Sequence, residues 1–95
     1  MPPTPNDFGL LSPTYKQTGA SVLVKTGVGK LRGIFVSSSS QATIKLWDNT
    51  SAATTVLVEE FTASGPFYYP MADVLFLTGL YITITGDLEC TIFYF

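Results

Sequence analysis

Short apolar runs separated by turn residues fill most of this chain, a pattern typical of β-strands. The run TIKLW at 43–47 is the clearest example, because its isoleucine and leucine fall on one face and its remaining side chains on the other. Turn-forming residues follow it at Asp48-Asn49-Thr50. The pattern therefore predicts a strand with one face toward a core.

Similar runs predict further strands along the chain. We expect them at residues 21–26, 30–36, 43–47, 54–61, 67–69 and 74–77, and in a closing hairpin over 79–95 that turns at Gly86-Asp87. A polar connection is expected at 37–40, and Pro70 is expected to interrupt the strand that begins at Phe67. No segment shows a sustained helical period. The predicted fold is all-β, a small antiparallel β-sandwich or jelly roll of about seven to eight strands.

The first 18 residues differ from the rest, because they hold four of the six prolines. Proline fixes φ and lacks an N–H donor, so we expect an extended N-terminal arm here and a single β-sandwich domain over 19–95. The arm carries four apolar side chains that we predict to anchor it to a capsid: Phe8, Leu10, Leu11 and Tyr15. The alternative is a disordered leader.

The closing residues of the chain are unusually apolar for a chain end. Alternation puts Tyr94 on one face of the last strand and puts Phe93 and Phe95 on the other. A strand that is apolar on both faces lies in the middle of a sandwich or under a partner subunit. We therefore predict that Phe93, Tyr94 and Phe95 contribute to a subunit interface.

Charge and composition narrow the classes of partner. Charged residues make up 13% of the chain, against about 25% in a typical soluble domain. Removing water from a surface with few charges costs little free energy, so such a surface suits burial against another protein. The alternative interpretation is an ordinary β-protein surface that happens to carry few charges. A net charge of −2 with five basic residues argues against nucleic-acid binding. Without a long apolar run or a basic leader, neither a membrane span nor a secretory signal is expected.

The sequence offers little catalytic chemistry. It has no histidine, and its single cysteine, Cys90, falls mid-strand as a small buried hydrophobe. Glu59 and Glu60 are adjacent on a strand and point to opposite faces, so they form no carboxylate pair. We expect no enzyme activity, no cofactor and no metal site.

One aromatic set offers a different interpretation. Trp47, Tyr68 and Tyr69 are candidates for a sugar-binding platform, since pyranose rings stack on aromatic faces. Aromatic side chains in an aromatic-rich domain belong more often to a core or an interface. A carbohydrate- or receptor-binding module is therefore kept as an alternative function.

Over about residues 29–95 the chain resembles small β-rich structural proteins of tailed bacteriophages. The pattern comprises GKLRGIFVSSSSQATIKLWDNTSAATTVLVEEFTASGPFYYP and FLTGLYITITGDLECTIFYF. Its recognisable parts are a Gly-x-Leu-x-Gly strand opening, the Ile-Lys-Leu-Trp-Asp strand with its Asn-Thr turn, and the late Thr-Gly-Leu-Tyr hairpin. The arm falls outside this resemblance.

The resemblance implies a capsid decoration (cement) protein. Such a protein would bind the major capsid protein on the outer shell of the virion, often as a homotrimer, after synthesis in the cytoplasm of a bacterial host. A tail or head–tail structural protein is the alternative within the same class. The resemblance carries no catalytic residues to this chain.

Overall fold

The computed structural model describes residues 14–95, which form eight strands and no helix. The strands are β1 (Thr14–Thr18), β2 (Val22–Thr26), β3 (Gly29–Ser39), β4 (Thr43–Trp47), β5 (Val56–Thr62), β6 (Phe67–Phe76), β7 (Gly79–Thr85) and β8 (Leu88–Tyr94). Every ladder between them is antiparallel. The all-β class predicted from sequence is confirmed.

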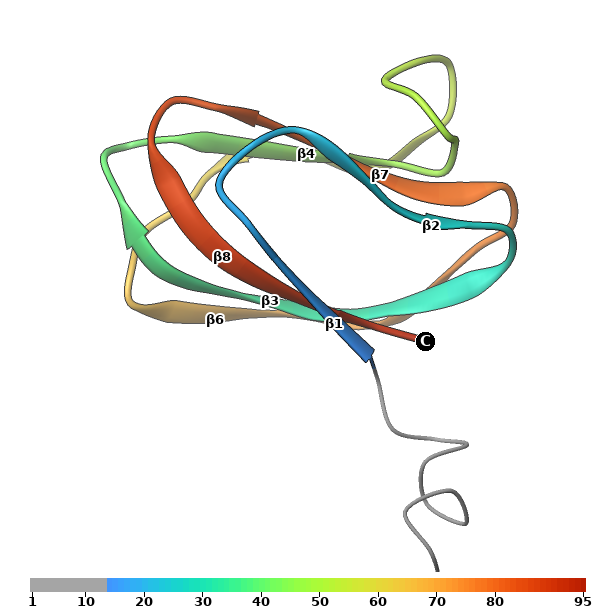
Figure 1. Ribbon diagram of the computed structural model, residues 1–95, viewed down its shortest axis with the longest axis horizontal. Coiled ribbons are helices and arrows are strands. Elements are labelled where there is room, and N and C mark those ends of the chain that lie inside the picture. The colour runs from blue at the N-terminus through green and yellow to red at the C-terminus, as the bar shows by residue number, and fades with distance from the viewer. Residues whose placement is uncertain (1–13) are drawn as a thin grey trace, which may run out of the picture.

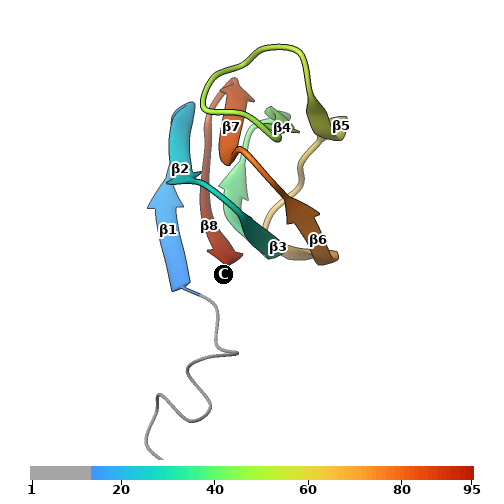
Figure 2. The ribbon, with the colours of Figure 1, turned by 90° about the vertical axis from the view of Figure 1, so that its right-hand side faces the viewer.

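The strands form two four-stranded sheets packed face to face. Sheet A has the order β1-β8-β3-β6 and sheet B the order β2-β7-β4-β5, and they form the lower and upper layers in Figure 1. The first four strands pair with the last four in reverse order: β1 with β8, β2 with β7, β3 with β6 and β4 with β5. This order is that of an eight-stranded jelly roll. Figure 2 shows β8 between β1 and β3.

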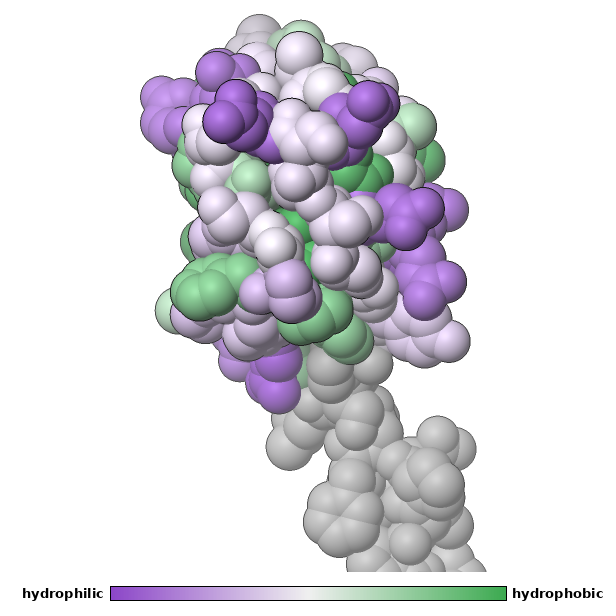
Figure 3. Space-filling model, turned by 90° about the vertical axis from the view of Figure 1, so that its left-hand side faces the viewer, coloured by the Kyte–Doolittle hydropathy of each residue, from purple (hydrophilic) through white to green (hydrophobic). Residues whose placement is uncertain are grey.

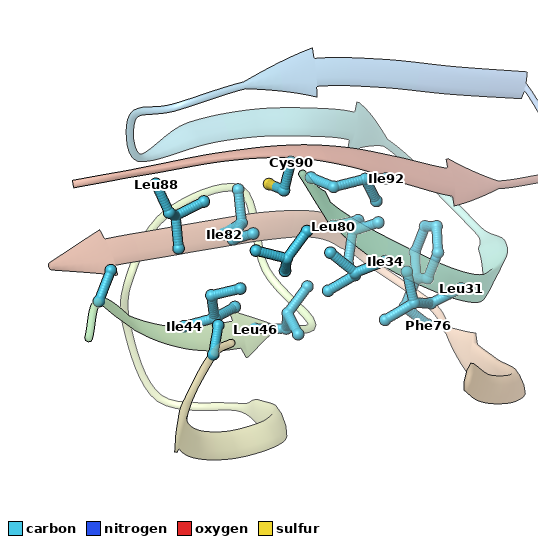
Figure 4. Close-up of a cluster of buried hydrophobic side chains, with 13 residues drawn as sticks. Leu31, Ile34, Ile44, Leu46, Phe76, Leu80, Ile82, Leu88, Cys90 and Ile92 are labelled. Carbon is cyan, nitrogen blue, oxygen red and sulfur yellow. The ribbon is translucent and has the colours of Figure 1, made fainter. Parts of the chain in front are cut away.

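The core lies between the two sheets and is entirely apolar among the residues described. Alternate side chains of each inner strand supply it, as in Ile44 and Leu46 of β4 and Leu80 and Ile82 of β7. Figure 4 shows these side chains meeting those of β3 and β8. Phe76 is the largest side chain that is fully buried. The predicted alternation of 43–47 is therefore correct.

The predicted arm does not extend to residue 18. Thr14–Thr18 form β1, which pairs residue by residue with β8, from Thr14 opposite Tyr94 to Thr18 opposite Cys90. Thr14–Thr18 therefore belong to the sandwich, because the hydrogen-bonding edge of β8 extends the sheet over these residues. Three of the predicted arm anchors (Phe8, Leu10 and Leu11) lie outside the described residues.

Two further strands are longer than predicted. β3 continues through Ser39, because its serines pair with Leu88 and Glu89 at the start of β8. β6 runs unbroken through Pro70, which an edge strand tolerates because one row of its N–H groups faces away from the sheet. A bulge at Ala72 and Asp73, with φ of 55° and 53°, lets the strand resume its pairing.

The turn predicted at Gly86-Asp87 forms, but the closing hairpin predicted over 79–95 is wrong. β7 belongs to sheet B and β8 to sheet A, so each pairs with other strands and the two do not pair with each other. Gly86 has a φ of 99°, the left-handed conformation that the predicted Gly86-Asp87 turn requires. Gly27 has a φ of 92° in the β2–β3 turn. Each turn joins a strand of sheet B to a strand of sheet A. Glycine adopts the positive φ seen at both positions without the steric cost that a side chain would add.

Candidate interaction surface

Four aromatic side chains gather on the outer surface of sheet A, and we call them the aromatic face: Tyr15, Phe35, Tyr68 and Phe93. Tyr15 on β1 lies directly opposite Phe93 on β8, and Phe35 on β3 lies directly opposite Tyr68 on β6. Residues directly opposite each other point to the same side of a sheet. Four strands thus bring together side chains from positions 15 to 93.

Gly33 makes room for this cluster. It lies opposite Phe93 in β3, and a Cβ atom added there would collide with the ring of Tyr68. The Tyr68 ring therefore lies over the bare backbone of Gly33, and its centroid is 6.3 Å from that of Phe93 in an edge-on arrangement. The glycine that the sequence places inside a strand serves a close approach of an aromatic ring.

The aromatic face is open to solvent. Tyr15 is 65% exposed, Tyr68 39% and Phe35 37%. Single exposed hydrophobic residues are normal on protein surfaces, but contiguous apolar patches mark interaction sites. The contiguity of these rings across four strands therefore makes the outer surface of sheet A a candidate interaction surface.

An ion pair borders the aromatic face toward the end of β8. Nε of Arg32 donates to Oδ1 of Asp73 at 2.9 Å, and Nη2 donates to Oδ2 at 3.0 Å. The guanidinium also lies 4.8 Å from the centre of the Phe95 ring. Hydrogen bonding from Arg32 holds the pKa of Asp73 below its ordinary value. The pair fixes the position of Phe95 beside the aromatic face.

The outer surface of sheet B is built differently. Nε1 of Trp47 donates to Oγ1 of Thr83 at 3.2 Å, and the ammonium of Lys45 lies 4.5 Å from the centre of a Trp47 ring. Lys45 also lies 3.7 Å from a carboxylate oxygen of Glu59. The large aromatic side chain of this surface is thus covered by a cation and held by a hydroxyl.

The structure separates the three closing residues that the sequence grouped as an interface. Phe93 belongs to the aromatic face, and Phe95 lies beside Arg32. Tyr94 points inward and packs, partly buried, against the core. Tyr15, predicted as an arm anchor, stands beside Phe93 instead of on a separate arm. Sequence reasoning missed Phe35 and Tyr68, because alternation gives the face of a residue but not its partner strand.

The predicted sugar platform is wrong, because its three members lie in different places. Trp47 is on the outer surface of sheet B and Tyr68 on that of sheet A. Tyr69 sits opposite the buried Ile34, packs against Phe61 with ring centroids 5.1 Å apart, and accepts a hydrogen bond from the Ser64 N–H. The three rings do not form one stacking surface.

The described residues hold few groups for acid–base or metal chemistry. Burial raises the pKa of the Cys90 thiol from 9.0 to about 11, so it stays protonated and weakly nucleophilic near neutral pH. No group of three or more metal-ligating side chains occurs within residues 14–95. Two shallow polar hollows of about 350 and 430 Å³ lie near Gly19. Around the β3–β4 and β7–β8 turns the surface is mostly of near-neutral hydropathy (Figure 3).

Asp48 joins two loops at the other end of the sandwich. Its carboxylate accepts hydrogen bonds from the N–H groups of Leu77, Thr78 and Gly79, the closest at 2.8 Å. Partial burial raises the pKa of Asp48, but these hydrogen bonds outweigh it and leave the pKa below its ordinary value. The role of this carboxylate is to fix the β6–β7 turn.

Comparisons with known proteins add no assignment. Searches against family models, curated proteins and solved structures found no match for this chain. None of the described segments is a helix long and apolar enough to cross a membrane. A function is therefore inferred from the aromatic face.

Proposed function

We propose that this protein is a non-enzymatic structural protein of a virion, most simply a capsid decoration protein that binds the outer shell. The open aromatic face of sheet A is the observation that carries the proposal. The sequence resemblance to bacteriophage structural proteins supports it, and so does the jelly-roll strand order, which capsid domains and lectins share.

The aromatic face has the chemistry of a docking surface. Tyrosine and phenylalanine supply large contact areas with only two side-chain torsions to immobilise, and aromatic anchors dominate binding energy in many interfaces. Within residues 14–95, the cation–π contacts and ion pairs involve none of these four rings, so docking them requires no ion pair to be broken. The tyrosine hydroxyls can keep hydrogen-bond partners after docking.

The partners follow from this mode of attachment. We propose that the major capsid protein receives the aromatic face and that the copies associate as a homotrimer on the shell. Each bound copy then favours the assembled shell by mass action. The same face would serve a tail or head–tail component, so the place in the virion is decided by the copy number of the protein in purified particles.

The test compares matched substitutions on the two sheets. Tyr15→Thr with Tyr68→Thr removes exposed rings from the aromatic face, and Leu23→Thr with Tyr81→Thr removes a cross-strand pair from sheet B. Purified particles that carry each variant are compared by gel band intensity against the major capsid protein. We expect occupancy to fall at least about tenfold for the sheet A variant only, which corresponds to about 1.4 kcal/mol of binding.

Two results would overturn the proposal. Equal occupancy of both variants at equal melting temperature would show that the aromatic face makes no shell contact. A wild-type protein that is absent from virus particles altogether would remove the virion assignment. Sedimentation of the free wild-type chain tests the trimer separately, since a stable monomer of the full chain contradicts that part.

A further inference from the structure

The two open edges of the sandwich carry opposite charge. β1 and β2 form one edge, and β5 and β6 form the other, at opposite sides of the molecule in Figure 2. The strands of the first edge contain Lys16 and Lys25 and no acidic residue. Those of the second edge contain Glu59, Glu60 and Asp73 and no basic residue. Each edge is therefore the electrostatic complement of the other edge on a second copy of the chain.

Lys16 carries the unpartnered charge of the first edge. It lies opposite the fully buried Ile92, so it points to the core side of β1, and its long side chain carries the ammonium out past the edge. Lys25 is engaged, since its Nζ donates to the main-chain oxygen of Phe95 at 3.0 Å. Within residues 14–95, no ion pair or hydrogen bond involves the Lys16 side chain. Its ammonium is available to a carboxylate beyond the edge.

Glu60 carries the corresponding charge of the second edge. A bulge in β5 places two residues, Glu59 and Glu60, against the single residue Lys45 of β4. Lys45 lies 3.7 Å from Glu59, and Asp73 is held by Arg32. Among the described residues, no ion pair or hydrogen bond involves the exposed Glu60 side chain. One carboxylate is thus left over on this edge, as one ammonium is left over on the other.

The backbone of β1 is also the most regular of the four edge strands. All five of its residues pair with β8 without a register shift, whereas the ladders of β2, β5 and β6 each contain at least one. A regular edge presents an unbroken row of main-chain donors and acceptors to a partner. Lys16 restricts which partner is accepted, because a second β1 laid against it would bring two ammonium groups together, whereas an acidic edge would neutralise the charge.

We propose that copies of this chain associate head to tail, with the β1–β2 edge of one copy against the β5–β6 edge of the next and Lys16 beside Glu60. A contact between two different surfaces is heterologous, and its repetition closes a ring where the rotation between copies allows. The inference rests on the self-association proposed above and names the surfaces that make it. The aromatic face stays open to the shell, because an edge contact does not cover the outer surface of sheet A.

Cross-linking between two variants of the full chain tests the proposal. Gln17→Cys and Thr62→Cys each place a thiol at an exposed position near one of the two charges and leave Lys16 and Glu60 unchanged. Each variant is treated with a short bis-maleimide, alone and in an equal mixture, and covalent dimers are quantified on denaturing gels. The native Cys90 is buried and its pKa of about 11 keeps its thiol out of the reaction, which the wild-type chain treated in parallel verifies.

We expect the mixture to give at least about ten times more covalent dimer than either variant alone, because a heterologous contact brings each thiol to the other variant and not to its own kind. Adding Lys16→Glu to the Gln17→Cys chain should lower the yield about two- to fivefold, the range of an exposed ion pair. Adding Glu60→Lys to the Thr62→Cys chain as well should restore the yield, because the two charges are then exchanged.

Three results would overturn the proposal. Equal yields from the mixture and from either variant alone would assign the association to like edges. Absence of covalent dimer would show that the two edges do not meet, and a charge reversal without effect would show that Lys16 and Glu60 do not face each other. Sedimentation of the wild-type chain separates the failures: an oligomer without the mixed cross-link contradicts only the choice of edges, whereas a monomer removes the self-association too. Shell binding through the aromatic face is tested independently of both.

Discussion

The outer surface of sheet A bears more aromatic side chains than that of sheet B, and the two surfaces hold their aromatic side chains differently. On sheet B, Trp47 is covered by Lys45 and hydrogen-bonded to Thr83. On sheet A, Tyr15 and Tyr68 stand open, and the nearest ion pair, Arg32 with Asp73, holds Phe95 at the border. Sheet B holds its tryptophan with a cation and a hydroxyl, whereas sheet A leaves its exposed rings available to a partner.

The difference shows that exposure of a ring alone does not mark a binding surface. What distinguishes sheet A is that its rings adjoin one another across four strands, with the Arg32–Asp73 ion pair at their border. A neighbouring cation or hydroxyl stabilises an aromatic ring that remains exposed to water, and this is the arrangement around Trp47 on sheet B. The comparison predicts different responses to substitution on the two surfaces.

The largest effect is expected from removing Phe93, Tyr94 and Phe95 together. This deletes a ring of the aromatic face, an inward side chain that packs on the core, and the Phe95 contact to Lys25. We expect the free energy of unfolding to fall by at least about 3 kcal/mol and the melting temperature by at least about 12 °C. Thermal melting measures it, and a shift of only a few degrees would contradict the structural role of these residues.

A smaller effect is expected from filling the space above Gly33. Gly33→Ala puts a methyl group where the Tyr68 ring lies, so we expect a loss of about 1–3 kcal/mol in unfolding free energy. In a Tyr68→Ala background the same substitution should cost less than about 0.5 kcal/mol. Urea unfolding of the four members of this cycle measures the coupling. An equal cost in both backgrounds would show that Tyr68 does not rest on Gly33.

Asp48 tests how firmly the β6–β7 turn that links the two sheets is held. Asp48→Asn weakens the three hydrogen bonds at the carboxylate, and we expect a loss of about 1–2 kcal/mol at neutral pH. Because the folded pKa of Asp48 is below its ordinary value of 3.8, its contribution is present above that value and is lost as the pH falls through the lowered pKa. The difference between wild type and variant in urea unfolding should shrink in acid. A difference that is constant from about pH 7 to about pH 2.5 would rule this out.

The smallest effect is expected on sheet B. Glu59→Gln removes the partner of Lys45, but the Glu59 side chain is 82% exposed and the distance is 3.7 Å. An exposed pair of this kind contributes little, so the unfolding free energy should change by less than about 0.5 kcal/mol. Urea unfolding at low and high salt measures it. A loss above about 1 kcal/mol would mean that the cation over Trp47 depends on Glu59 for its position.

Much of this fold could be predicted from periodicity, and most of what could not depends on strand pairing. The runs at 43–47 and 79–95 alternate clearly and form strands where expected, but β7 and β8 lie in different sheets instead of pairing as the predicted hairpin. β1 was missed because the prolines before it indicate an arm, while its partner strand is β8, at the other end of the sequence. The aromatic face was unpredictable for the same reason. Alternation places Tyr15 and Phe93 on outer faces, but only the register places them side by side.

The pairing of β1 with β8 has a consequence for how the chain reaches this structure. Thr14 and Tyr94 are 80 positions apart, yet Oγ1 of Thr14 donates to the main-chain oxygen of Tyr94. During synthesis, β1 and β3 have no strand between them until β8 has left the ribosome, so sheet A cannot close before then. Pairing strands so far apart in sequence costs loop-closure entropy. Folding is slow for this reason, in the range of milliseconds to seconds for β-sandwiches. A nascent chain that stops short of β8 would expose the edges of both flanking strands, the kind of surface that chaperones and aggregation compete for.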